Sequence, residues 1–201
     1  RYLWSLRVDV VGFAGHRLSM IAIISGSIRE DSNARRVGHY LECVYKGLGA
    51  ETAFLDLGDL PPEAYLGTAY KDRPDAVQGG FIDPVLRASG LVVIVPEYNG
   101  SYPGVLKHFI DLLPFPESFD GRPVAFVGLA AGYYGGLRAV EQLQMVFAYR
   151  NGVLFNRRVF IPNIYAVIGD TGELKDPEIQ ERLDLHAQSF LEFIGKVARS
   201  G

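Results

Sequence analysis

The chain has 201 residues, 48% of them hydrophobic, and a formal net charge of −3. This length fits one domain with a sizeable core, and the slightly negative charge disfavours non-specific binding to nucleic acid. No apolar run reaches the roughly 18 residues of a membrane-spanning helix, and a single cysteine excludes an internal disulfide, a CxxC pair and a cysteine-ligated cluster.

The N-terminal segment, residues 1–19, differs from the rest of the chain. It contains three arginines and one acid, and Met20 then opens the first clear apolar run. Asp9 interrupts its only apolar stretch, which disfavours a secretory signal, whereas the scarcity of acids leaves a mitochondrial-type presequence open. We expect residues 1–19 to be non-native or upstream-translated sequence outside the fold, and residues 20–201 to form the domain.

Apolar runs and helical patterns alternate along the first half of the domain. Apolar runs without alternation predict strands that are buried on both faces, as in a parallel sheet. A helical pattern contains Cys43, for which we expect a buried, unreactive thiol. Between these elements lies a long loop rich in Pro, Gly, Asp and Tyr, of a length that is often functional. The predicted elements are strands at 20–24, 52–57 and 91–95, helices at 34–48 and 83–89, and the loop at 58–80.

The second half continues the same alternation. An apolar segment at 159–168 contains Pro162 and Asn163, so we expect it to be extended and to lie at a sheet edge. Alternating strands and helices predict an α/β domain with five parallel strands in a doubly wound sheet and helices on both faces, whose strand order the pattern leaves open. The remaining elements are helices at 105–113, 137–150 and 177–198, and strands at 123–129 and 153–155.

The first of three polar loops follows the strand at 20–24. It places Ser27, Ser32 and Asn33 before or at the start of a helix, where free N–H groups and the helix dipole attract an anion. Arg29 adds a guanidinium that can contact a phosphate through two hydrogen bonds. Neither GxxxxGK[ST] nor GxGxxG occurs there. The pattern therefore predicts a small phosphate cradle, although a capped helix with an exposed arginine explains it equally well.

Two further loops follow the strands at 91–95 and 123–129. The loop at 96–104 has two tyrosines with flat faces, and its Asn99-Gly100 pair tolerates positive φ. The loop at 131–136 has three glycines before a helix, which favours backbone N–H groups facing a ligand. Ligands bind at the carboxyl ends of strands in open α/β sheets, so we expect a flat, polar-edged ligand there. An ordinary turn and a glycine hinge with packed tyrosines are the structural alternatives.

Catalytic side chains and metal ligands receive no support from the sequence. No G-x-S-x-G nucleophile elbow occurs, and the four histidines have no ligand spacing. We expect His108 to pack or to face solvent, and we treat the Asn99-Gly100-Ser101 glycosylation sequon as a chance match.

Residues 20 to about 195 resemble the NAD(P)H-dependent FMN reductase family of the flavodoxin-like fold, which includes azo-dye, quinone and chromate reductases. Residues 26–32 (GSIREDS) resemble its G-S-x-R-x-x-S loop, and residues 96–111 (PEYNGSYPGVLKHFID) resemble its P-E-Y-N-x-S-x-P-G-x-L-K-x-x-x-D signature. Residues 131–136 (AGYYGG) resemble its glycine-rich loop. Departures at 108, 109 and 112 lie on one helix, so they bear on a dimer contact more than on flavin binding.

The resemblance implies non-covalent FMN, with NAD(P)H as co-substrate and no catalytic side chain, because the flavin carries the chemistry. It also implies a homodimer or homotetramer, and we expect a cytoplasmic location. The implied contacts are Ser27, Arg29, Ser32 and Asn33 to the phosphate, Pro96, Glu97, Tyr98, Asn99 and Gly100 to the isoalloxazine, and Gly132, Tyr133 and Gly135 to its pyrimidine edge.

The implied activity is hydride transfer from nicotinamide to FMN and then to a quinone, azo, metal-oxyanion or flavin acceptor. The alternative is a non-enzymatic flavodoxin-type electron carrier or flavin-dependent sensor, since fold alone does not decide function. Ser27-Ile28-Arg29 differs from the Thr-rich loop of flavodoxins, and the chain is less acidic than such carriers. A partner-binding module with degenerate loops is the third reading.

Overall fold

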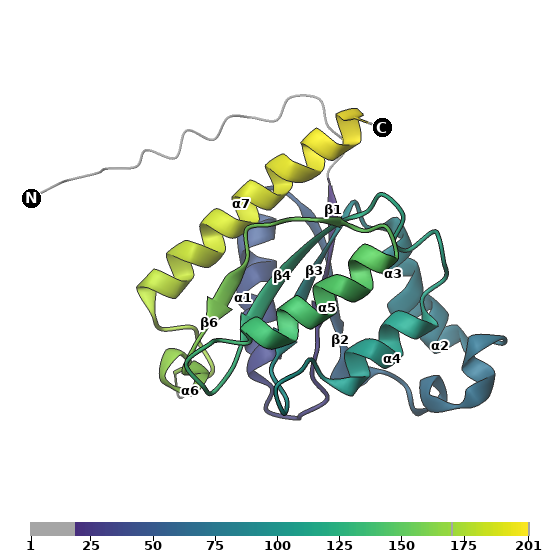
Figure 1. Ribbon diagram of the computed structural model, residues 1–201, viewed down its shortest axis with the longest axis horizontal. Coiled ribbons are helices and arrows are strands. Elements are labelled where there is room, and N and C mark those ends of the chain that lie inside the picture. Colours follow the sequence, from purple (N-terminus) through teal and green to yellow (C-terminus); the bar gives the residue numbers. More distant parts are fainter. Residues whose placement is uncertain (1–18, 170, 201) are drawn as a thin grey trace, which may run out of the picture.

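The computed structural model describes residues 19–169 and 171–200 (Figure 1), so the leader predicted at 1–19 lies outside the described residues except for Ser19. A six-stranded parallel sheet has the order β2-β1-β3-β4-β5, and β6 also pairs with β4. Among the described helices, none is long and apolar enough to cross a membrane. The strands are β1 (Met20–Ser25), β2 (Glu51–Asp56), β3 (Gly90–Pro96), β4 (Pro123–Leu129), β5 (Val153–Leu154) and β6 (Val159–Ile161).

The register brings the ends of the central strands to one edge of the sheet. Ser25 of β1 pairs with Ile94 of β3, and Pro96 of β3 pairs with Leu129 of β4. The chain leaves β1 toward β2 on one side and returns to β3 on the other, so the direction of winding reverses beside β1. Such a switch point opens a crevice at the carboxyl ends of the strands.

Helices cover both faces of the sheet, as the doubly wound prediction requires (Figure 1). Alternate strand residues enter opposite cores: Ile23 and Val92 pack toward α1 and α7, whereas Ile24 and Val93 pack toward α3, α4 and α5. Both faces of the strands are therefore buried, which explains their continuous apolar runs. The helices are α1 (Asn33–Gly47), α2 (Asp75–Val77), α3 (Asp83–Arg87), α4 (Gly104–Leu112), α5 (Leu137–Tyr149), α6 (Ile164–Val167) and α7 (Pro177–Ser200).

The expectation of a buried thiol at Cys43 is wrong, because the Cys43 side chain is exposed. Helix α1 buries Val37, Leu41 and Tyr45, which recur every four residues on one stripe. Cys43 lies two residues from Leu41 and from Tyr45, and two residues turn a helix by about 200°. The cysteine therefore faces away from the sheet.

The loop predicted at 58–80 is more ordered than expected. Its first part contains short 3₁₀ turns at Leu57–Asp59, Pro62–Tyr65 and Gly67–Tyr70. The helix predicted at 83–89 is preceded by α2 and by a π-helical turn at Gln78–Ile82, so helical structure begins at Asp75. Buried Val77 and Ile82 anchor this extension in the core, a tertiary contact that local composition does not reveal.

The strand predicted at 153–155 is confirmed as β5, but the sheet holds one strand more than the five predicted. β5 has only two residues and pairs with Pro123 and Val124 at the start of β4. β6 pairs in parallel with residues 127–129 at the end of β4, where an extended edge segment was expected. Since β3 occupies the other side of β4, the two short strands share the fifth position of the sheet. Pro162 ends β6, and α6 follows within the segment expected to be extended.

Candidate functional site

A cleft of about 380 Å³ lies at the carboxyl ends of β1, β3 and β4. Its position is the switch point of the sheet, where all three polar loops begin. The loops bring together residues from three separate parts of the chain. The lining residues are Ser27, Arg29, Asp31, Ser32, Asn33, Ala34, Pro96, Glu97, Tyr98, Asn99, Leu129, Ala130, Ala131, Ile164 and Tyr165.

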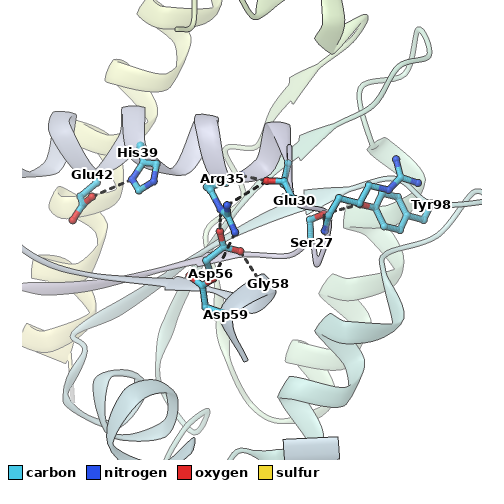
Figure 2. A network of polar contacts seen from close by, with 11 residues as sticks. Ser27, Glu30, Arg35, His39, Glu42, Asp56, Gly58, Asp59 and Tyr98 are labelled. Atoms are coloured by element: carbon cyan, nitrogen blue, oxygen red, sulfur yellow. Dashed lines mark hydrogen bonds and ion pairs between the residues drawn. The ribbon is translucent and has the colours of Figure 1, made fainter. Parts of the chain in front are cut away.

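A direct contact joins the first two loops. The Ser27 hydroxyl lies 2.7 Å from the Tyr98 hydroxyl, and Ser27 is only 1% exposed (Figure 2). Ser27 Oγ also accepts a hydrogen bond from the Arg29 backbone N–H at 3.2 Å. The Arg29 guanidinium carbon lies 4.3 Å from the centre of the Tyr98 ring, a cation–π distance. Tyr98 therefore holds both the serine and the arginine of the first loop at the cleft.

The first turn of α1 supplies the other half of the phosphate cradle. Ser32 is the N-cap, and its Oγ accepts from the Arg35 N–H at 3.4 Å. Asn33 Oδ1 accepts a hydrogen bond from Arg36 Nη1 at 3.0 Å. This contact uses the oxygen of the Asn33 amide and not its N–H₂ group. No acidic residue occupies the first turn of α1, although Asp31, which directly precedes the N-cap, also lines the cleft. Backbone N–H groups at the N-terminal end of a helix bind anions.

A partly buried ion pair braces this loop from behind. Arg35 Nε donates to the buried Asp56 carboxylate at the end of β2, and Arg35 Nη1 donates to the Glu30 carbonyl at 3.2 Å (Figure 2). Asp56 Oδ1 also accepts from Gly58 N–H at 3.0 Å. The hydrogen bond to Asp56 raises the pKa of Arg35 above its usual value. The Arg35 guanidinium is thus used in contacts that support the loop. The arginine that lines the cleft itself is Arg29.

The second loop turns sharply at Asn99-Gly100. Tyr98 N–H donates to the Ser101 carbonyl at 2.8 Å, and Ser101 N–H donates back to the Tyr98 carbonyl at 3.1 Å. Asn99 and Gly100 have φ values of 52° and 78°, which confirms the expected positive φ and matches a type I′ turn. Gln142 of α5 donates to the Gly100 carbonyl at 3.2 Å and accepts from the Ser101 hydroxyl at 2.5 Å.

Glu97 places a buried carboxylate oxygen without a hydrogen-bond partner in the wall of the cleft. Its Oε2 is buried and has no hydrogen-bond partner among the described residues, while its Oε1 lies 3.8 Å from Arg138 Nη1. The Glu97 N–H donates to the Leu129 carbonyl at 3.0 Å, so the residue is fixed between two strand ends. A buried acceptor without a partner is costly, and a ligand with N–H or O–H groups in the cleft would satisfy it.

Of the third loop, residues 131–136, only Ala131 lines the cleft. Gly132, Tyr133 and Gly135 do not line the cleft, and neither does Gly100; Tyr133 is 81% exposed. A Cβ on Gly135 would come within 2.8 Å of the Ile161 backbone nitrogen, so that glycine is required for packing against β6. Contacts of these residues with a bound flavin stay predictions.

Sequence reasoning missed the part of the wall that follows β6. Ile164 and Tyr165 of α6 line the cleft beside Ala130 and Ala131, and Tyr165 is 70% exposed. Recognition of 159–161 as a strand parallel to β4 would have predicted this, because its carboxyl end must reach the same edge. The brace between Arg35 and Asp56 has no comparable signal, since it joins residues far apart in the sequence.

His108 lies away from the cleft, as expected for a residue that packs or faces solvent. Its ring stacks on Tyr65 at 4.8 Å between centroids, and its Nε2 lies 2.9 Å from the Ala64 carbonyl. It thereby fastens the segment after β2 to α4.

Comparisons with known proteins point in one direction. A family model described as NADPH-dependent FMN reductase matches residues 19–166. A 2-hydroxy-1,4-benzoquinone reductase from Burkholderia sp. is 29% identical over 178 residues, which cover 87% of this chain and 95% of the relative. An NAD(P)H-dependent FMN reductase from Pseudomonas aeruginosa is 30% identical over 171 residues, which cover 83% of this chain and 90% of the relative.

Among solved structures, the flavoenzyme FerB from Paracoccus denitrificans, an NAD(P)H:(acceptor) oxidoreductase, aligns with a TM-score of 0.75 and 27% identity over 89% of this chain and 98% of its own. Flavodoxin 1 from Bacillus cereus, with a TM-score of 0.57 and 14% identity over 87% of this chain and 98% of its own, shows the same fold alone. The expected α/β flavodoxin-like fold and the expected oxidoreductase family are confirmed. From the family match and the relatives together, the chain belongs to the NADPH-dependent FMN reductases.

Proposed function

We propose that this protein holds FMN in the cleft at the ends of β1, β3 and β4 and reduces quinones with NAD(P)H. The observation that carries the assignment is the cradle formed by Arg29 and the first turn of α1. The cradle offers backbone N–H groups, a guanidinium and two hydroxyls to one phosphate. No second phosphate-binding loop adjoins it in the sequence, which favours FMN over FAD.

The residues of the cleft fit the rest of the group. Pro96, Glu97, Tyr98 and Asn99 form one wall, and a flat polar ring beside them would meet the partnerless Glu97 Oε2. When bound, FMN supplies hydride acceptance and donation, which no protein side chain provides. The chain's own part is to bind the phosphate, orient the ring and leave one side of it open beside the exposed Tyr165.

The quinone class is the acceptor we favour. Relatives named quinone reductase include proteins from Pseudomonas putida and Escherichia coli, each 27% identical to this chain. An NADPH azoreductase from a Bacillus strain is 28% identical, so azo compounds are the second acceptor class. Both classes are flat and conjugated, and can follow the nicotinamide into the same open cleft. Metal oxyanions and free flavin complete the panel to be assayed.

We further propose a homodimer built on the face between α4 and α5. A groove of about 610 Å³ lies there, and its lining includes the exposed side chains of Met145 and Tyr149. Gln142 lines the same groove and holds the turn at residues 98–101, so a partner seated there would contact a residue that shapes the flavin loop. Light scattering of the wild type and of Met145→Lys tests this, with loss of a dimer expected in the variant.

A cytoplasmic location fits the use of NAD(P)H and is checked by cell fractionation.

The test of the activity is anaerobic. NADPH added to the FMN-loaded protein should bleach the visible flavin absorbance, and 1,4-benzoquinone should restore it with consumption of one equivalent. Bleaching without restoration by any acceptor of the panel would favour an electron carrier or sensor. Failure of NADPH and NADH to bleach the flavin would contradict the proposal.

A further inference from the structure

A second pocket lies apart from the flavin cleft, between the segment that leads into β6 and the second and third turns of α7. β6 and α7 are in contact on this side of the sheet (Figure 1). The pocket has a volume of about 190 Å³ and shares no lining residue with the flavin cleft. Its lining residues are Arg157, Arg158, Val159, Arg182, Leu185 and His186.

Three guanidinium groups surround this pocket. Arg157 donates to the Ser189 hydroxyl at 3.2 Å, and Arg158 donates to Gln144 Oε1 at 3.2 Å. Within residues 19–169 and 171–200, the Arg182 guanidinium has no hydrogen bond or ion pair. Because each guanidinium carries five N–H donors, most of the donors around the pocket are unused.

No carboxylate is among the residues that line the pocket. The one carboxylate paired with these arginines, in the part of the chain that the structure describes, is Glu141, whose Oε1 lies 3.9 Å from Arg158 Nη1. The lining itself carries three positive charges and no negative one, while Glu178, Glu181 and Asp184 lie on the adjoining turns of α7. An excess of this kind attracts anions into the concave surface.

The fourth polar side chain of the pocket is unsatisfied. His186 is 4% exposed, and neither ring nitrogen has a hydrogen-bond partner among the described residues. Burial lowers the pKa of His186 to about 4, and the nearby Arg157 carbonyl acts in the opposite direction. The ring is thus neutral at pH 7 and carries one N–H donor. The Arg157 carbonyl attracts that donor without a hydrogen bond of normal geometry, so a ligand oxygen in the pocket would give it a full partner.

We propose that this pocket binds one phosphate group. The planar guanidinium fork matches phosphate oxygens and makes paired hydrogen bonds to them, and a neutral histidine adds a further donor. The volume is below the ~300–1,000 Å³ of sites for drug-sized ligands, so the pocket takes a phosphate group and not a whole nucleotide.

Two sources of the phosphate share this chemistry. One is free inorganic phosphate. The other is the phosphate that distinguishes NADPH from NADH, and this source rests on the proposed function. Val159 lines the pocket and Ile164 lines the flavin cleft. The five-residue separation spans at most about 17 Å of extended chain. That length is compatible with one elongated ligand engaging both sites.

Calorimetric titration with sodium phosphate provides the first test. The protein is loaded with FMN, so that the flavin cradle is filled, and sodium chloride holds the ionic strength constant. Arg182→Gln should weaken phosphate binding by about ten- to a hundred-fold, as expected for loss of charged hydrogen bonds. Arg87→Gln is the matched control, because Arg87 is exposed on α3, far from this pocket, and should leave the affinity unchanged.

Steady-state kinetics separates the two sources. If NADPH supplies the phosphate, Arg182→Gln raises KM for NADPH at least about ten-fold and leaves KM for NADH unchanged. If free phosphate is the ligand, both KM values stay unchanged while the calorimetric affinity falls. An unchanged phosphate affinity together with an unchanged ratio of the two KM values overturns the proposal.

A separate control distinguishes failure here from failure of the proposed function. If the protein does not take up FMN, the titration is repeated with the Arg29→Ala variant, which lacks the guanidinium of the flavin cradle. Phosphate binding that persists in Arg29→Ala and weakens in Arg29→Ala/Arg182→Gln supports this pocket. Phosphate binding that disappears in Arg29→Ala alone assigns the phosphate to the cradle and overturns the proposal.

Discussion

The hydroxyl groups of Tyr98 and Ser27 lie 2.7 Å apart and join two loops that are 71 residues apart in the sequence. The same tyrosine ring carries the Arg29 guanidinium on its face. One aromatic side chain therefore sets the positions of two groups assigned to phosphate binding.

Tyr98→Phe tests that link. Loss of one partly buried hydrogen bond should lower the free energy of unfolding by about 0.5–1.5 kcal/mol, while the ring and its contact with Arg29 remain. Urea denaturation of the FMN-free protein measures the change. Tyr133→Phe is the control, because its exposed hydroxyl should matter by less than about 0.5 kcal/mol. Equal stability of both variants would show that the contact between Ser27 and Tyr98 adds nothing.

The brace behind the loop predicts a larger effect. Asp56→Asn leaves the Arg35 guanidinium without its buried carboxylate and should cost about 1–3 kcal/mol of unfolding free energy. Asp59→Asn is the matched control, since Asp59 is 74% exposed and lies 3.7 Å from Arg35 Nη2; an exposed pair contributes at most about 1 kcal/mol. Denaturant titration compares them, and a greater loss for Asp59→Asn would contradict the brace.

Much of the fold follows from the sequence because the strands at 20–24, 91–95 and 123–129 are buried on both faces and show as continuous apolar runs. At the edge of the sheet the short strand at 153–155 was predicted, but β6 was expected only as an extended segment, since its three residues are too few to show a period. Loop composition located the carboxyl-end cleft. The wall from α6 and the pair of Arg35 with Asp56 depend on contacts between distant segments, which no local pattern encodes.

Burial of His186 predicts acid sensitivity. Its folded pKa of about 4 lies below the ordinary value of 6.5, so the unfolded chain binds more protons between these values and stability rises with pH. On acidification from pH 6.5 to 4, the histidine should remove up to about 3 kcal/mol. The difference in unfolding free energy between wild type and His186→Leu, measured across that window, checks this. A difference in unfolding free energy that does not change with pH would contradict this prediction. The control is His39→Gln, a substitution of an exposed histidine, measured across the same pH window.

The turn at Gly100 predicts strain without a clash. A Cβ there would meet no atom within 4 Å, yet φ is +78°, so Gly100→Val should cost about 1–2 kcal/mol. Because the turn aims Tyr98 and Asn99, the same variant should also bind FMN more weakly. Gly104→Ala is the control, since it too has open space and lacks a positive φ. Fluorescence titration with FMN compares the two, and normal FMN binding by Gly100→Val would separate this loop from the flavin.

The central claim is that the cradle of Arg29 and the first turn of α1 holds the phosphate of FMN. The direct measurement is the Kd of FMN for the apo-protein, with riboflavin, which lacks the phosphate, as the second ligand. Arg29→Ala should weaken FMN binding about ten- to a hundred-fold and leave riboflavin binding unchanged, with circular dichroism showing an intact fold. An unchanged Kd for FMN, or an equal loss for FMN and riboflavin, would contradict the account.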